Sequence, residues 1–158
     1  MANTQSMCTS FLGELMTATH NLGTAPIRAT STADTIKAAL YLTSATLNAS
    51  TTAYSATGEV SGTNYTAGGV TVTNATPPAS TNSSTTAGVG YWTPSASIVY
   101  TTVTLTTAFD TVLLYNSTQS DKAISVHTFG SQTITAGTFT LTMPSNTTTT
   151  ALLRLATT

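Results

Sequence analysis

Residues 98–106, IVYTTVTLT, and residues 138–143, TFTLTM, decide the fold class of this 158-residue chain. In the second stretch Phe139, Leu141 and Met143 alternate with threonines, so one side of an extended segment is apolar and the other carries hydroxyl groups. A period of two residues is the period of a β-strand. Threonine, which suits a pleated sheet, fills about a quarter of the chain, far above ordinary usage. The two stretches predict a β-rich domain.

Further strands are indicated from residue 36 to the C-terminus. Short apolar or alternating runs are separated by glycine, proline and asparagine, which favour turns. The predicted strands are Ile36–Leu42, Glu59–Tyr65, Val70–Asn74, Ile98–Thr106, Val112–Asn116, Ala123–Phe129, Thr138–Met143 and Ala151–Leu155. No helical pattern alternates with them, so a parallel α/β sheet is not expected. The sequence predicts an all-β fold, an antiparallel β-sandwich or jelly-roll-like domain with a short N-terminal α-helix.

One segment near the N-terminus has the helical period. In Ser6–Asn21 the apolar side chains recur every three or four residues, which places Met7, Phe11 and Leu15 on one stripe of a helix. Asn21 or the glycine at position 23 can end this helix in the left-handed conformation. The helix then either lies on the edge of its own domain or reaches a neighbouring subunit.

These patterns divide the chain into two parts. Residues 1–25 form an N-terminal helical segment, and residues 26–158 form the β-sandwich domain. Within that domain the stretch TPPASTNSSTTA, residues 76–87, has no apolar side chain larger than alanine or proline. It predicts a long exposed loop near residues 76–90.

Charge is almost absent from the chain. It has four Lys and Arg, five Asp and Glu, and a formal net charge of −1. Nucleic-acid binding needs clustered basic side chains, which are missing, so no nucleic-acid partner is expected. No apolar run is long enough for a membrane span. A surface rich in hydroxyl groups and poor in charge suits a protein that packs against copies of itself or a partner lattice.

The first twenty residues contain no Lys or Arg and no continuous apolar run, so no secretory signal is expected. We therefore expect the protein to be synthesised in a cytoplasm. A single cysteine, Cys8, excludes an internal disulfide, and its place on the apolar stripe favours a small core residue over a nucleophile.

Catalytic patterns are missing from the sequence. His20 and His127 have no acidic neighbour close in sequence, and the five carboxylates show no paired spacing for a glycosidase or a metal site. Asp34 is expected to belong to a turn or a helix cap. We therefore predict no enzyme activity, no catalytic residue, no cofactor and no metal ligand.

Aromatic side chains raise a second possibility. Tyr54, Tyr65, Tyr91 and Trp92 could form a patch on which a sugar ring stacks, as in a glycan-binding module. The alternative is that Trp92 anchors the long loop to the edge of the sandwich or to a subunit interface. We favour the anchoring role, because stacking sites usually include acidic or amide partners in a recognisable motif.

Several motifs carry a resemblance to a known family. The opening SMC-x-SF-x-x-EL pattern (residues 6–15) precedes ALY at residues 39–41, and AY-x-x-x-x-EV-x-G-x-x-Y-x-AGG follows at residues 53–69. LLYNST (residues 113–118) and DKAISVHTFG (residues 121–130) come later. Over most of its length the chain resembles a family of small virion structural proteins of tailed bacteriophages.

The resemblance implies a structural role in the particle. The first expectation is a capsid decoration, or cement, protein that stabilises the head through subunit contacts. A tail or head-tail accessory protein is the alternative, as is a glycan-binding module displayed on the particle. The expected partners are further copies of the chain, for instance as a trimer, and the major capsid protein or other virion proteins.

The N-terminal segment Met1–Leu22 is expected to make the contact with the shell or with a sister subunit. The residues predicted for the assembly interface are Met7, Phe11, Leu15, Tyr91 and Trp92.

Overall fold

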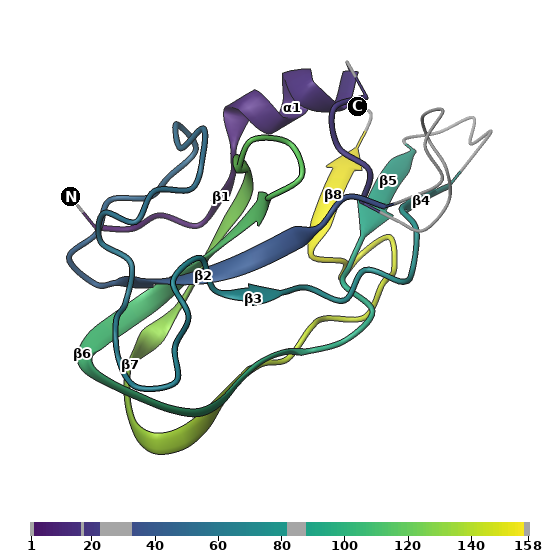
Figure 1. Ribbon diagram of the computed structural model, residues 1–158. Helices are drawn as coiled ribbons and strands as arrows, with labels where there is room; N and C mark the ends of the chain where they lie inside the picture. The colour runs from purple at the N-terminus through teal and green to yellow at the C-terminus, as the bar shows by residue number, and fades with distance from the viewer. Residues whose placement is uncertain (1, 17, 23–32, 82–87, 157–158) are drawn as a thin grey trace.

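The computed structural model describes residues 2–16, 18–22, 33–81 and 88–156. Within them the elements are β1 (Ser6–Met7), α1 (Thr9–Met16), β2 (Ile36–Leu42), β3 (Val70–Thr71), β4 (Ala79–Ser80), β5 (Val89–Trp92), β6 (Ile98–Asn116), β7 (Lys122–Leu141) and β8 (Leu153–Ala156). One sheet has the order β1-β7-β6-β2-β3 and a smaller one the order β4-β5-β8. All neighbouring strands are antiparallel. The all-β fold with a short N-terminal helix is confirmed (Figure 1).

A long hairpin of β6 and β7 forms the centre of the molecule. Each strand joins two of the predicted strands. The pattern indicates breaks at 107–111 and at 130–137, but β6 runs through the first and β7 through the second, with one left-handed residue, Ala136, inside β7. The interruptions instead appear as shifts of register between β6 and β7, where extra residues bulge out of the ladder. The hairpin turn contains Ser120 and Asp121, both with positive φ.

The hairpin bends so that one strand pair contributes to two layers. Near its end β6 pairs with β2 through residues 109–116. At its beginning, Tyr100 instead donates a buried hydrogen bond to the carbonyl of Ala38 on β2 over 2.8 Å. Phe109 and Phe139, from the two strands of the hairpin, meet edge to face with 5.2 Å between ring centroids. The bend thus closes the sheet over a core of aliphatic and aromatic side chains.

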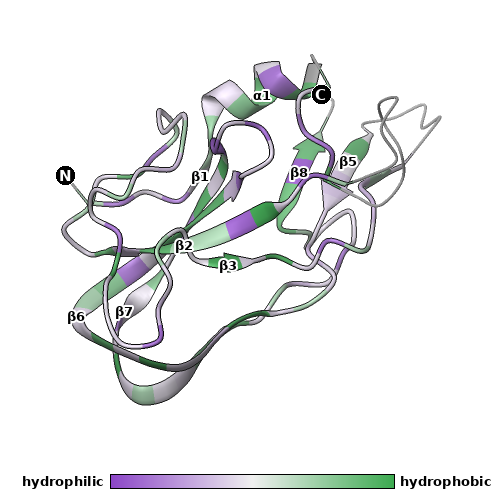
Figure 2. Ribbon diagram, in the orientation of Figure 1, coloured by the Kyte–Doolittle hydropathy of each residue, from purple (hydrophilic) through white to green (hydrophobic). Residues whose placement is uncertain are grey.

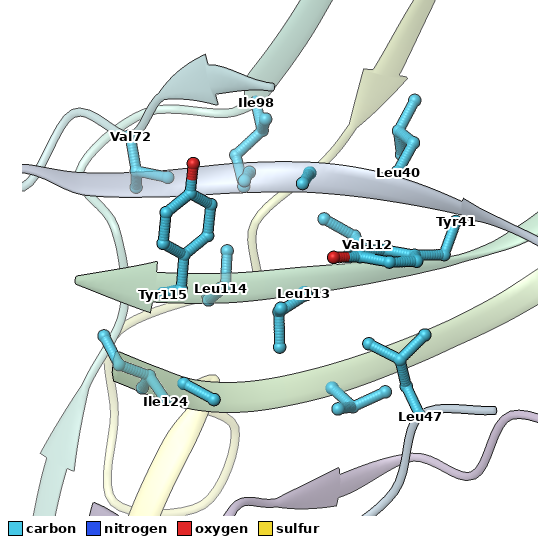
Figure 3. Packing of buried hydrophobic residues seen from close by; sticks show 14 of the residues in the cluster. Leu40, Tyr41, Leu47, Val72, Ile98, Val112, Leu113, Leu114, Tyr115 and Ile124 are labelled. Atoms are coloured by element: carbon cyan, nitrogen blue, oxygen red, sulfur yellow. The ribbon is translucent and has the colours of Figure 1, made fainter. Parts of the chain in front are cut away.

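Strand β2 matches its predicted bounds and is the most apolar strand of the core. In Figure 2 it is coloured as hydrophobic except for one hydrophilic band, and Lys37 is its only charged residue. Figure 3 shows buried side chains carried by β2, β6 and β7, among them Leu40, Leu113 and Ile124. All three are fully buried. A strand buried on both faces reads as a continuous apolar run, which is why IKAALYL was recognisable.

The predicted strand Glu59–Tyr65 is wrong. This segment makes only isolated bridges, including Thr63 to Thr104 on β6. A Cβ added to Gly62 would lie 2.0 Å from the carbonyl oxygen of Thr104, and Asn64 has a φ of 60°. Close approach of two backbones and a left-handed residue produce an irregular loop here, not a ladder.

The predicted helix Ser6–Asn21 is shorter in the structure. Residues Ser6–Met7 pair with β7, and the helix spans Thr9–Met16. Ala18, with a φ of 53°, follows the helix, and the amide of Thr19 donates to the carbonyl of Glu14 over 2.9 Å. The left-handed residue is thus an alanine, while position 23 and the proposed boundary at 25–26 lie outside the described residues.

The N-terminal segment belongs to the core of the β-domain. Cys8, Phe11 and Leu22 are buried in the same cluster as the side chains of β2, β6 and β7. The helix α1 lies across one end of the molecule, next to the sheet that contains β8 (Figure 1). This arrangement corresponds to a helix that closes the end of its own sandwich.

The small sheet was largely missed by the strand prediction. Strand β5 and the two-residue β4 lie in or beside the predicted loop near 76–90, of which residues 82–87 are outside the described part. Ala79 pairs with Tyr91, and Trp92 pairs with Leu153 of β8. Because β4 is short and exposed, the sequence around it has no alternating pattern to recognise.

Candidate functional site

An apolar pocket lies between the N-terminal segment and the small sheet. Its volume is about 140 Å³. Eleven residues line it: Met7, Phe11, Leu15, Leu22, Pro78, Ala79, Gly90, Tyr91, Trp92, Leu153 and Leu155. All five residues predicted for the assembly interface are among them, although they come from parts of the chain that are more than 70 residues apart in sequence. The fold therefore brings the predicted set together.

The five residues take two different places in the pocket. Phe11 and Trp92 are only 1% and 2% exposed, so they form its floor. Met7, Leu15 and Tyr91 are partly exposed and form its rim. Only the rim residues are placed to contact another molecule directly. The floor residues act by shaping and supporting the hollow.

The anchoring role predicted for Trp92 agrees with its contacts. Its indole Nε1 donates a hydrogen bond to the carbonyl of Thr76 over 3.1 Å. The amide of Leu152 donates to the hydroxyl of the adjacent Thr93 over 2.9 Å. These bonds tie β5 to the segment that precedes β4 and to the segment that leads into β8. A buried tryptophan whose N–H is satisfied is a packing residue, not an exposed stacking platform.

Two exposed leucines lie on elements that line the pocket. Leu155 on β8 lines it and is 42% exposed, and Leu12 on α1, one turn before Leu15, is 43% exposed. Among the described residues the remaining large apolar side chain with comparable exposure is Val99 on β6. Two of these three exposed side chains thus lie on α1 and β8, which both contribute lining residues to the pocket.

A polar network fastens α1 to the central hairpin. Lys122 at the start of β7 contacts Oε1 of Glu14 at 2.6 Å, and Nε2 of His20 contacts Oε2 of Glu14 at 2.8 Å. Burial alone would favour the protonated form of Glu14, but the hydrogen bonds from Lys122 and His20 lower its pKa overall. The helix is held in one position by charge-assisted bonds.

His20 continues this network into the interior. Asn116 donates to Nδ1 of His20 over 3.0 Å and to Oδ2 of Asp34 over 2.7 Å. The amide of Asn21 also donates to Oδ2 of Asp34. His20 thus has an acidic partner that its sequence neighbourhood did not suggest, and Asp34 is a buried acceptor from two separate segments. The sequence gives no signal for this set, because its members are joined only by the fold.

Burial governs the chemistry of the ionisable side chains around this network. It lowers the pKa of His20, against the opposing effect of Glu14. Burial, with the charge of Glu14, raises the pKa of Cys8 to about 11. The thiol is therefore protonated at neutral pH, as expected for a small core residue and not for a nucleophile.

The motif residues quoted at positions 53–69 converge on one carboxylate. Glu59 accepts hydrogen bonds from the hydroxyl of Tyr54 (2.6 Å), the hydroxyl of Tyr65 (2.8 Å) and the amide of Gly68 (2.7 Å). The hydroxyl of Tyr65 also accepts from the amide of Leu40 on β2. The Glu59 cluster, defined by these residues, attaches an irregular loop to β2. We interpret it as a set of hydrogen bonds that stabilises the fold.

The aromatic residues considered for glycan stacking do not form one patch. Tyr54 stacks on Tyr115 with 4.8 Å between centroids, and Tyr65 stacks on Tyr100 at 5.9 Å. Both stacks belong to the Glu59 side of the large sheet. Tyr91 and Trp92 lie in the small sheet, where they line the apolar pocket.

Two further features bear on function. Within the described parts of the chain, no three or more His, Cys, Asp and Glu side chains are grouped so that they could hold a metal ion. The described helix is too short to cross a membrane. No protein-family model, curated protein or solved structure matches this chain.

Proposed function

We propose that this protein is a structural component of a tailed-bacteriophage particle, a decoration or cement protein that binds the outside of the head. The observation that carries the proposal is the apolar pocket, with Leu155 exposed in its lining and Leu12 exposed on α1. The near absence of charge and the resemblance of the motifs to small virion proteins support the same role. The proposed partner at the pocket is the major capsid protein, and the proposed location is the virion.

The proposed mechanism is the addition of buried apolar area to the lattice. Burial of an exposed leucine contributes about 1–2 kcal/mol, so the pocket rim supplies a modest energy for each copy. A shell carries many copies, and each bound copy stabilises only the assembled form of the shell. Weak single contacts can therefore strengthen the whole head.

The rigid attachment of α1 favours such binding. Glu14 is bonded to both Lys122 and His20, so the helix and the rim residue Leu15 are already held in place before a partner arrives. A surface that is ordered in advance loses less conformational entropy on binding. The polar network thus serves the proposed function indirectly.

The test uses particles that lack this chain and purified protein added back to them. We expect the wild-type protein to bind at regular positions on the head and to raise the temperature at which the head releases its DNA. Leu12→Lys and Leu155→Lys should each weaken binding by about tenfold, because each places a charge at an apolar contact. Val99→Lys is the matched control, since Val99 is similarly exposed but lies on β6, whereas Leu12 and Leu155 lie on α1 and β8, which both contribute lining residues to the pocket.

The site of binding decides between the structural alternatives. Cryo-electron microscopy density on the head is the expected result. Density confined to the tail would replace the decoration role with a tail or head-tail accessory role. A protein that is absent from the particle and does not bind to it would contradict the proposal.

A further inference from the structure

A second, more polar hollow adjoins the apolar pocket. It has a volume of about 460 Å³ and is lined by residues 5–7, 125–127, 144 and 150–154. Met7 and Leu153 line both hollows, so the two lie next to each other. No Asp or Glu is among the residues that line the polar hollow, whereas Arg154, one of the four basic residues of the chain, is.

The hydroxyl of Ser125 determines which nitrogen of His127 carries the proton. Ser125 is fully buried, and among the described residues its hydroxyl contacts Nε2 of His127 alone, at 2.9 Å. A buried hydroxyl that donates nothing loses free energy, so Ser125 donates and Nε2 accepts. Burial lowers the pKa of His127 to about 4, so the imidazole is neutral at pH 7 and its one proton lies on Nδ1. Nδ1 is thus a donor, and it has no hydrogen-bond partner in the described part of the chain.

Arg154 presents a second set of donors at this hollow. Its side chain is exposed, and Nη1 donates to the carbonyl of Thr148 over 3.5 Å, which is long for a hydrogen bond. The ion pairs formed among the described residues join Glu14 to His20 and to Lys122, and Arg154 takes part in neither. Most of the five N–H groups of the guanidinium therefore have no acceptor within the described residues.

Donors without acceptors indicate which chemical group this hollow would bind. An ionised carboxylate only accepts hydrogen bonds, and arginine binds it through two parallel N–H donors. The one positive charge of Arg154 beside a neutral His127 matches one negative charge, whereas a phosphate group carries nearly two at pH 7. We propose that the polar hollow is a carboxylate-binding site, with Arg154 as the ion-pair partner and Nδ1 of His127 as a second donor.

Two sources can supply a carboxylate to this site. One is a small carboxylic acid from solution. The other is an Asp or Glu side chain of a protein that is seated on the adjoining apolar pocket. The inference does not rest on the proposed function, because the site would bind a free carboxylate wherever the protein is located.

The test follows the imidazole of His127 by nuclear magnetic resonance while sodium acetate is added to the purified full chain at pH 7. We expect a saturable shift of the His127 signals, and no saturable shift with sodium chloride at the same ionic strength. His20 is the internal control, since both of its ring nitrogens already contact Glu14 and Asn116. Arg154→Gln should weaken acetate binding by about tenfold. Lys37→Gln is the matched control, because it removes the same charge from β2, which does not line the hollow.

Several outcomes would overturn the inference. These are a His127 signal that does not respond to acetate, an equal response to chloride, or an Arg154→Gln variant that binds acetate as well as the wild type. Tighter binding of inorganic phosphate than of acetate would also overturn the assignment to a carboxylate.

Binding to particles then separates the two sources. If Arg154→Gln loses both acetate binding and particle binding, the carboxylate belongs to a partner protein. If this variant loses acetate binding but still binds particles, the ligand is a small molecule. A wild-type protein that binds acetate but not particles would contradict the proposed function alone.

Discussion

Asn116, at the end of β6, donates a hydrogen bond to Nδ1 of His20 over 3.0 Å, and this contact determines the tautomer of the imidazole. Because Nδ1 accepts, the proton lies on Nε2, which donates to Glu14. The side-chain oxygen of Asn116 in turn accepts from the amides of Thr118 and Gln119. The orientation of the Asn116 amide is thus set on both sides. One side chain links the N-terminal segment, β6 and the hairpin turn.

Replacement of Asn116 should therefore lower the stability of the folded protein. Asn116→Ala removes one buried donor from Asp34 and one from His20, and it removes the side-chain acceptor of the Thr118 and Gln119 amides. We expect a loss of about 2–4 kcal/mol in the free energy of unfolding, measured by urea denaturation. Gln119→Ala is the control: it removes a longer contact of 3.3 Å to Asp34, and should cost under about 1 kcal/mol. Equal effects of the two variants would show that the network does not stabilise the fold.

The buried His20 and the half-buried His127 predict a pH dependence of stability. Burial lowers the pKa of His20 and lowers that of His127 to about 4. The unfolded chain, with histidine pKa values near 6.5, then binds more protons than the folded chain at mildly acidic pH, so stability falls as the pH falls below about 6.5.

The measurement is the free energy of unfolding at pH 7 and at pH 5. We expect a decrease of about 1–3 kcal/mol for the wild-type protein. His127→Gln should remove its share of the decrease, and His20→Gln the remainder. The window lies above the usual pKa of glutamate, and the pKa of Glu14 is lower still, so this carboxylate does not contribute to it. A double variant with the full wild-type decrease would contradict the assignment.

Glu59 should stabilise the loop that contains it. Glu59→Gln removes the charge that strengthens the bonds from Tyr54, Tyr65 and Gly68. We expect a loss of about 1–3 kcal/mol in the free energy of unfolding and a change in the near-ultraviolet circular dichroism of the stacked tyrosines. Tyr54→Phe, which removes one of the three bonds, should cost about 1 kcal/mol. A neutral Glu59→Gln variant would mean that the loop is held by packing alone.

Gly69 marks the closest approach of this loop to β2. A Cβ there would lie 1.7 Å from the carbonyl oxygen of Ala38, and the residue has a φ of 71°. Gly69→Ala should therefore destabilise the protein by about 3 kcal/mol or more, measured as a decrease of the denaturation midpoint. Gly13→Ala, in open space on α1, should instead be neutral or stabilising by up to about 1 kcal/mol. Similar effects at both positions would contradict the close approach.

The outcome for individual elements shows which patterns in the sequence were informative. The run Ile36–Leu42 was found with its bounds, because a strand buried on both faces is continuously apolar. The run Glu59–Tyr65 was also predicted as a strand, yet it forms a loop because Glu59 is bonded within its own segment and Gly62 lies against Thr104. The spacing of apolar residues shows which face of a segment is apolar. Whether the segment pairs as a strand depends on which other backbone lies beside it.

The sequence by itself determined the class of the fold and the presence of a helix near the N-terminus. Both follow from the period of apolar side chains, which is a local property. Only the tertiary structure decided that Phe11 and Trp92 share one pocket and that Asn116 reaches His20. Those relationships join residues that are distant in the chain. They arise where the bend of a hairpin and the order of strands place separate segments together.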